Sequence, residues 1–194
     1  RETGAAQFRN HEGKIVASSE LTDEDMTDIG SAIPKFTYGI TLNLEYKGFD
    51  FTAFGTGVAG NKIFNILYRA DSPLRNSLKY YMDNAWTPEN KGASMPAVNN
   101  VATDLNFWSS SAAMFNGSYF KIKQLQLGYT LPKRLTQKVA IKDLRFFVSL
   151  DDFFTFSNYP GMDPETATTG NNGGAGFDIG SYPTMKKCSF GASF

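Results

Sequence analysis

Residues 35–46 read KFTYGITLNLEY and carry the clearest structural signal in the chain. Every even position from Phe36 to Tyr46 holds an aromatic or aliphatic side chain, and the odd positions between them hold Thr, Gly, Asn or Glu. A period of two is a β-strand pattern. Strands of soluble proteins usually run about 5–6 residues, whereas a tilted membrane strand needs about 9–11. The length of this alternation, with aromatic residues near both ends, therefore predicts a membrane-spanning strand with aromatic rims.

Four further segments complete the expected strand set. The segment 117–130 changes parity near Lys123-Gln124, which predicts a β-bulge. In the last, Cys188, Phe190, Ala192 and Phe194 alternate with small or polar residues and form one apolar stripe. This stripe resembles the terminal signal by which outer-membrane proteins are recognised for barrel assembly. The four segments are 49–58, 117–130, 144–156 and 183–194.

The connections between these strands alternate in length. The turn at 47–48 and the connection at 131–143 are short, and the other three segments are long. Short turns on one side and long loops on the other are typical of outer-membrane barrels, whose short side is periplasmic. We expect an extracellular loop at 1–34, a hairpin at 35–58, an extracellular loop with a short helix at 59–116, a hairpin at 117–156, an extracellular loop at 157–182 and a terminal strand at 183–194.

The expected helix lies inside the second long loop. Ser72 is a good N-cap residue, and Pro73 suits the first helical position. Leu74, Leu78, Tyr81 and Met82 follow at helical spacing. This spacing predicts a short amphipathic helix.

Composition removes several classes of function. Lys plus Arg and Asp plus Glu number 19 each, so the chain lacks the basic surplus of a nucleic-acid binder. A single cysteine and a single histidine argue against a zinc site or a catalytic triad. Asp151 and Asp152 are adjacent on a strand and point to opposite faces, so they are not a catalytic pair. We expect no enzyme activity, no cofactor and no bound metal, and we interpret Asp23, Asp25 and Asp28 as a solvated loop.

Several short blocks, in order along the chain, resemble the C-terminal barrel of SusC/RagA-like TonB-dependent transporters. They cover about residues 10–194. The blocks are IPKFTYG at 33–39, GFDF at 48–51, WTPEN at 86–90, GSYFKIK at 117–123, QLGYTLP at 126–132, FTF at 154–156, YPGMDPE at 159–165 and GSYP at 180–183, leading to Phe194. The chain departs from the family in two places. The family often carries a stretch that resembles a calcium-binding loop, and residues 9–14 lack most of its carboxylates. The family also tends to show GQN where residues 150–152 read LDD.

The resemblance implies an all-β, antiparallel transmembrane β-barrel segment: about five long strands of a barrel of about 22 strands. It implies a plug that contacts TonB, a SusD-like surface lipoprotein as lid, and import of oligosaccharides or peptides across the outer membrane of a Gram-negative, Bacteroidetes-like bacterium. Five strands cannot close such a barrel, so the plug and upstream strands are required partners, together with outer-membrane lipid. The chain opens Arg1-Glu2-Thr3-Gly4 without a signal peptide. We therefore expect an N-terminal part to be missing and Phe194 to be the barrel's own last residue.

Three aromatic residues in the long outer loop are candidate contacts with the substrate or the lid protein, because aromatic faces stack on sugar rings. They are Tyr68, Trp86 and Trp108. Packing within the loop is the competing interpretation. For the chain as a whole, the alternative is a soluble β-sandwich that binds glycans and buries the even face of 36–46 in its own core. A hydrolase is disfavoured because no nucleophile and base can be paired.

Overall fold

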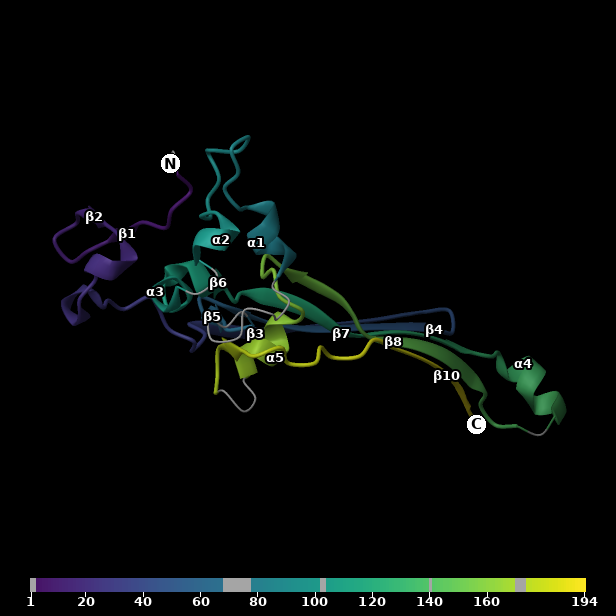
Figure 1. Cartoon of the computed structure of the whole chain (residues 1–194). Coiled ribbons are helices and arrows are strands. Elements are labelled where there is room, and N and C mark those ends of the chain that lie inside the picture. Colours follow the sequence, from purple (N-terminus) through teal and green to yellow (C-terminus); the bar gives the residue numbers. More distant parts are fainter. Residues whose placement is uncertain (1–2, 68–77, 102–103, 140, 170–173) are drawn as a thin grey trace. The chain divides into compact units, whose positions relative to one another are not determined.

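The computed structural model describes the chain except for residues 1–2, 68–77, 102–103, 140 and 170–173. The chain divides into two compact units, each assembled from three separate segments (Figure 1). The strand unit consists of Pro34–Gly60, Ser118–Asn158 and Pro183–Phe194. The loop unit consists of Arg1–Ile33, Asn61–Gly117 and Tyr159–Tyr182.

The strand unit is a five-stranded antiparallel sheet in the order β10-β8-β7-β4-β3. Four of its strands have 11 to 13 residues, which is the length a tilted membrane strand requires. The expectation of five long antiparallel strands is therefore confirmed for four of them, and β10 is shorter. The strands are β3 (Phe36–Tyr46), β4 (Phe49–Ala59), β7 (Tyr119–Thr130), β8 (Arg145–Ser157) and β10 (Lys187–Ser193).

A two-residue turn joins β3 to β4. Tyr46 pairs with Phe49 across the ladder, and Lys47 and Gly48 between them have φ of 48° and 87°. Positive φ at both central residues defines a type I′ turn, whose twist matches that of the flanking strands. The turn therefore fixes the β3–β4 register over all eleven pairs.

The predicted β-bulge is confirmed and lies at Lys123. The register shifts between Ile122 and Gln124 on the β8 side of β7, and between Phe54 and Gly55 on the β4 side. Asp152 of β8 has a φ of 57°, and its carboxylate lies 2.7 Å from the Lys123 ammonium. The bulge brings Ile122 and Leu125 to the same face of the sheet. Strict alternation along β8 would place Asp152 on the face that carries Leu150, and its ion pair with Lys123 compensates the charge.

The last strand differs from its prediction at 183–194. β10 begins only at Lys187 and ends at Ser193, so Cys188, Phe190 and Ala192 lie on it and Phe194 lies one residue beyond. Side chains, not a backbone ladder, hold the preceding segment: the Lys121 ammonium donates to Thr184 at 2.5 Å. Pro183 has no backbone N–H to give to a ladder.

The connection between β7 and β8 carries two short helical turns, α4 (Lys133–Thr136) and η4 (Gln137–Val139). The backbone N–H of Leu131 donates to the Leu144 carbonyl at 2.9 Å and closes the base of this connection. Thr136 is buried, and its hydroxyl donates to the Lys133 carbonyl at 3.3 Å. The basic side chains of Arg134 and Lys138, two residues to either side of it, are exposed.

The loop unit is more ordered than the loops predicted at 1–34, 59–116 and 157–182. A three-stranded sheet in the order β6-β5-β9 joins the second and third segments, with β5 parallel to β9. Ile63, Ala167 and Tyr159 form its core, with Phe115 packed against them. Its elements are β1 (Phe8–Arg9), β2 (Ile15–Val16), η1 (Ser18–Glu20), η2 (Asp23–Asp25), β5 (Lys62–Asn65), α1 (Lys79–Asp83), α2 (Val98–Val101), α3 (Leu105–Trp108), η3 (Ser111–Ala113), β6 (Met114–Asn116), α5 (Pro164–Thr169) and β9 (Phe177–Asp178).

The helix predicted to start at Ser72 is described only as α1 (Lys79–Asp83), whose N-cap is Leu78, and its apolar face differs in part from the prediction. Tyr81 is buried, whereas Met82 is 63% exposed. Ser72, Pro73 and Leu74, the predicted start, lie outside the described residues. Among the residues that are described, no helix has both the length and the apolarity needed to cross a membrane.

Candidate functional site: an apolar sheet face and a pocket in the loop unit

One face of the strand unit carries apolar side chains on all five strands, and we call it the apolar face. At one end, the cross-strand pairs align Tyr46, Phe49, Tyr129 and Phe146 in a single row. The rings of Phe49 and Tyr129 lie 4.4 Å apart, and the Lys47 ammonium lies 5.0 Å from the Tyr46 ring. This row of amphipathic and apolar rings is the arrangement of a membrane-interface girdle.

A second aromatic row lies at the other end of the same face. Tyr38, Phe120 and Phe156 stack with ring centroids 5.9 and 6.4 Å apart, and Phe36 stacks on Tyr38 at 5.5 Å. Gly57 lies beneath the Tyr38 ring, where an added Cβ would come within 2.5 Å of the ring and 2.6 Å of a backbone oxygen. The β4 glycines, which weaken the sequence alternation, make room for rings from neighbouring strands.

Mostly aliphatic side chains, together with Phe51 and Phe190, fill the space between the two aromatic rows. Phe36 and Tyr46 are ten residues apart on β3, which corresponds to roughly 33 Å along the strand and roughly 25 Å along the normal of a membrane with the usual tilt. Ile40 and Leu44 in this band are 57% and 55% exposed. The aligned rows are Leu44, Phe51, Leu127, Val148 and Phe190, and Leu42, Ala53, Leu125, Leu150 and Cys188.

The opposite face of the strand unit is polar. Arg145 donates from Nε and Nη2 to the Asp50 carboxylate at 2.8 and 2.5 Å. Thr52 donates to Asn43 at 3.0 Å, and Ser149 donates to Asp151 at 2.8 Å. Apolar residues on one face and hydrogen-bonded polar residues on the other match a wall between lipid and a watery lumen.

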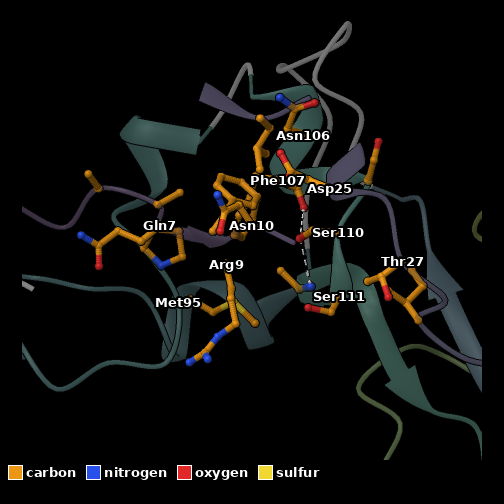
Figure 2. Close-up of a pocket in the computed structure, with 18 of the residues that line it drawn as sticks. Gln7, Arg9, Asn10, Asp25, Thr27, Met95, Asn106, Phe107, Ser110 and Ser111 are labelled. Atoms are coloured by element: carbon orange, nitrogen blue, oxygen red, sulfur yellow. Dashed lines mark hydrogen bonds between the residues drawn. The ribbon is translucent and has the colours of Figure 1, made fainter. Parts of the chain in front are cut away.

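A separate pocket of about 1230 Å³ lies within the loop unit. Its lining comes from three stretches of the chain, 4–29, 86–96 and 106–112. Figure 2 shows Arg9, Met95, Phe107 and Ser110 among the side chains around it. Polar and apolar side chains contribute about equally to this lining.

The three predicted contact residues are not brought together. Trp86 lines the pocket and packs against Gly4, whose missing Cβ leaves room for the indole. Trp108 packs edge-on against Tyr81 and Phe107, with ring centroids 5.0 and 4.9 Å apart, and is not among the pocket residues. Tyr68 lies outside the described residues.

The acidic stretch expected to be a solvated loop is held by a hydrogen-bonded clasp on one side of the pocket. The Asp25 carboxylate accepts from the His11 backbone N–H at 2.9 Å and lies 2.7 Å from the His11 ring nitrogen. It also accepts from the Thr22 N–H at 2.8 Å. The His11 N–H, followed by the Thr22 N–H, lowers the pKa of Asp25 well below its ordinary value. Within the described residues, no three His, Cys, Asp or Glu side chains gather as a metal site would require.

The comparisons with known proteins agree with the sheet and its faces. TonB-dependent receptor P3 of Formosa agariphila is 33% identical over 182 residues, which is 90% of this chain and 18% of the receptor. TonB-dependent receptor P26 of the same organism is 25% identical over 194 residues. The chain matches one section of the TonB-dependent receptors. No protein-family model matches it.

Solved structures that resemble this chain show the same fold. The RagAB peptide transporter superposes with a TM-score of 0.73 at 24% identity, covering 98% of this chain and 21% of that one. The open-open state of the RagAB peptide importer gives a TM-score of 0.71 at 23% identity. This likeness to the RagAB structures shows the fold that the sequence resemblance implied. The relatives are receptors and not enzymes, and this chain spans about a fifth of their length.

Proposed function

We propose that the strand unit is a section of the wall of an outer-membrane importer, with the apolar face toward lipid and the polar face toward the lumen. The observation that carries this proposal is the pair of in-register aromatic rows, Tyr46 to Phe146 and Tyr38 to Phe156, with exposed aliphatic rows between them. In water, such a face would be an unusually large apolar patch exposed to solvent. In a bilayer, it matches the hydrocarbon thickness and its two interfaces.

The two ends of the strands give the proposed wall its direction. The short connections at Lys47–Gly48 and Leu131–Leu144 both lie at the Tyr46 end of the sheet, and the opposite ends lead into the loop unit. Short turns mark the periplasmic side of outer-membrane barrels. The loop unit is then extracellular, and the outer edges of β3 and β10 pair with the remaining strands of the barrel, which together with a plug complete it.

The proposed activity is import of oligosaccharides or peptides, energised through TonB by way of the plug and capped by a SusD-like lipoprotein, in a Bacteroidetes-like bacterium. The relatives named TonB-dependent receptors support the energy source, and the RagAB structures support peptides as one substrate class. Trp86 is the proposed contact for substrate or lid protein, because it lines the pocket of the loop unit. The stripe from Cys188 to Ala192, followed by Phe194, is the proposed signal for barrel assembly.

Uptake by cells that depend on the complete protein tests the activity. Fluorescent peptides and oligosaccharides are supplied to cells carrying the wild type, a TonB deletion or a deletion of the SusD-like partner. We expect one substrate class to accumulate in the wild type and neither to accumulate without TonB. Equal accumulation with and without TonB would contradict the proposal.

A pair of tryptophan variants tests the site within that assay. W86A is expected to reduce uptake at a normal outer-membrane protein level, because Trp86 lines the pocket. W108A removes a ring that packs against Tyr81 and Phe107 and is expected to lower the protein level instead. Unchanged uptake by W86A would remove Trp86 from the proposed site.

The soluble β-sandwich alternative does not fit the strand unit. A sandwich buries one face of each sheet in its own core. Phe36, Ile40 and Leu44, which that core would need, are 55–63% exposed in this structure. Detergent-free solubility of the complete protein would reopen this alternative.

A further inference from the structure

The acidic and basic residues of this neutral chain are divided unevenly between its two units. The strand unit holds eleven of the 19 basic residues and five of the 19 acidic ones. The loop unit therefore carries the acidic excess. Two of the basic residues of the strand unit form ion pairs within it: Lys123 with Asp152, and Arg145 with Asp50. A third carboxylate, that of Asp151, accepts a hydrogen bond from Ser149.

Apart from Lys123 and Arg145, the strand unit has nine basic residues, and five of them gather at the end of the sheet with the short connections. The connection between β7 and β8 carries four exposed basic side chains and one acidic residue, Asp143. Lys47 in the other short turn adds a fifth. Figure 1 shows α4, which carries Lys133 and Arg134, beyond the end of the strands. We call the set the basic rim: Lys47, Lys133, Arg134, Lys138 and Lys142.

The basic rim adjoins the apolar face. Tyr46, Phe49, Tyr129 and Phe146 form the aromatic row at the same end, and the Lys47 ammonium lies 5.0 Å from the Tyr46 ring. Leu135, between the basic residues of the connection, is 55% exposed. The order from the sheet centre outward is therefore aliphatic, aromatic and basic, with one exposed leucine among the cations.

We propose that the basic rim binds the phosphate groups of anionic phospholipids in the leaflet at that end of the barrel. Lys and Arg form charge-assisted hydrogen bonds with phosphate oxygens, and their long stems let the charged groups reach the headgroup layer while Leu135 contacts acyl chains. A phosphodiester headgroup carries the complementary charge at the depth where the aromatic row places the rim. This inference rests on the proposed membrane orientation of the strand unit, in which that leaflet is the periplasmic one.

Native mass spectrometry of the complete transporter tests this site. The protein is purified from detergent containing equal parts phosphatidylglycerol and phosphatidylcholine, and retained lipids are counted. Each basic residue near an anionic surface strengthens binding roughly fivefold. The combined variant K133Q, R134Q, K138Q and K142Q is therefore expected to lower phosphatidylglycerol retention by about tenfold or more. Phosphatidylcholine retention is expected to stay unchanged.

Two matched variants control for total charge and for folding. The variant K14Q, K62Q, K79Q and K91Q removes the same charge from the loop unit and is expected to retain phosphatidylglycerol. The variant K133R, R134K, K138R and K142R keeps the charge at the rim and is expected to retain it too. If the neutralised rim does not fold, the single variants R134Q and K138Q replace it, each with an expected loss of roughly fivefold.

Three results would overturn the proposal. One is unchanged phosphatidylglycerol retention in the rim variant. Another is an equal loss in the loop-unit control. The third is displacement of the lipid by inorganic phosphate beyond that caused by chloride at the same ionic strength, which would assign the rim to free phosphate. The retained lipids are counted on purified protein and do not depend on uptake. Failure of the uptake assay and failure of the lipid assay can therefore be told apart.

Discussion

Asp50 of β4 and Arg145 of β8 join across an intervening strand. The two hydrogen bonds between them, of 2.8 and 2.5 Å, pass over Gly128 of β7. A Cβ at Gly128 would overlap the Asp50 carboxylate and the Arg145 guanidinium. The missing side chain is therefore what lets the ion pair connect three strands on the polar face.

The first prediction concerns this ion pair. Because about a quarter of each side chain is exposed, D50N is expected to lower the free energy of unfolding by about 1 kcal/mol. G128A is expected to cost a similar amount by displacing the same pair. The double variant is then expected to cost little more than either single one. Urea unfolding of the complete protein in detergent micelles measures this, and fully additive costs would contradict the coupling.

The second prediction concerns the glycines under the aromatic row. At Gly57 an added Cβ meets both the Tyr38 ring and a backbone oxygen, so G57A is expected to destabilise by about 1–3 kcal/mol. Gly39 on β3 provides the control, because its Cβ would find no atom closer than 3.7 Å. G39A is expected to change the free energy of unfolding by less than about 0.5 kcal/mol. Equal effects of the two variants in the same urea titration would count against close packing at Gly57.

The third prediction concerns the pH dependence of the Asp25 clasp. Hydrogen bonds from His11 and Thr22 hold the pKa of Asp25 below its ordinary value of 3.8. The unfolded segment therefore takes up a proton before the folded one, so the stabilisation is complete above pH 3.8 and is lost as the pH falls below it. Protease cleavage within residues 8–28 is expected to accelerate on acidification past that pH, with an acid-active protease.

The variant D25N separates the clasp from general acid effects. It is expected to be cleaved faster already at neutral pH, because an amide oxygen accepts weaker hydrogen bonds than a carboxylate. D23N changes a neighbouring carboxyl outside the clasp and is expected to behave as the wild type. A D23N profile matching that of D25N would show that local charge, and not the clasp, is responsible.

The fourth prediction concerns a buried hydrogen-bonded chain in the loop unit. Asn65 donates to the Tyr159 hydroxyl at 2.9 Å, and that hydroxyl donates to the buried Asp178 carboxylate. Y159F removes this partner from the Asn65 amide nitrogen and from one Asp178 carboxylate oxygen, and is expected to cost about 1–3 kcal/mol. Y182F, at a tyrosine that is 79% exposed, is expected to be neutral. Resistance of the loop unit to trypsin is the measurement, and equal cleavage of both variants would contradict the assignment.

The same tyrosine predicts an alkaline limit. Burial, followed by the bond to Asp178, raises the pKa of Tyr159 above its ordinary value of 10.0. The unfolded state loses its proton first as the pH rises, so the stabilisation is complete below pH 10.0 and declines above it. Y159F is expected to lack this decline in the trypsin assay, and a decline identical to the wild type would assign it to other groups.

The sequence predicted the strand unit well because a membrane strand repeats its pattern over many residues. The alternation from Phe36 to Tyr46 and the parity change at Lys123 each left a local signal, and both are confirmed. The start of β10 was placed too early, at 183, although the alternation itself begins only at Lys187, where the backbone ladder with β8 also begins. The packing role of Gly55 and Gly57 left no local signal, because the rings that cover them come from other strands.

The loop unit was largely missed for a different physical reason. Its strands have two to four residues, too few to show a period, and β5 pairs with residues more than a hundred positions away. The pocket depends on such long-range contacts, so Trp86 was found only by its residue type. The clasp between His11 and Asp25 left no signal, because a lone histidine in a polar segment is typical of a solvated loop.

The orientation of β3 in the membrane is the central claim, and cysteine accessibility tests it most directly. Single cysteines are placed at positions 40 to 45 of the complete transporter in outer membranes, with Cys188 replaced by alanine. We predict that a water-soluble maleimide labels 41, 43 and 45 and spares 40, 42 and 44, with the reverse pattern for a membrane-confined reagent. Labelling that does not alternate, or that favours the even positions from water, would contradict a lipid-facing apolar wall.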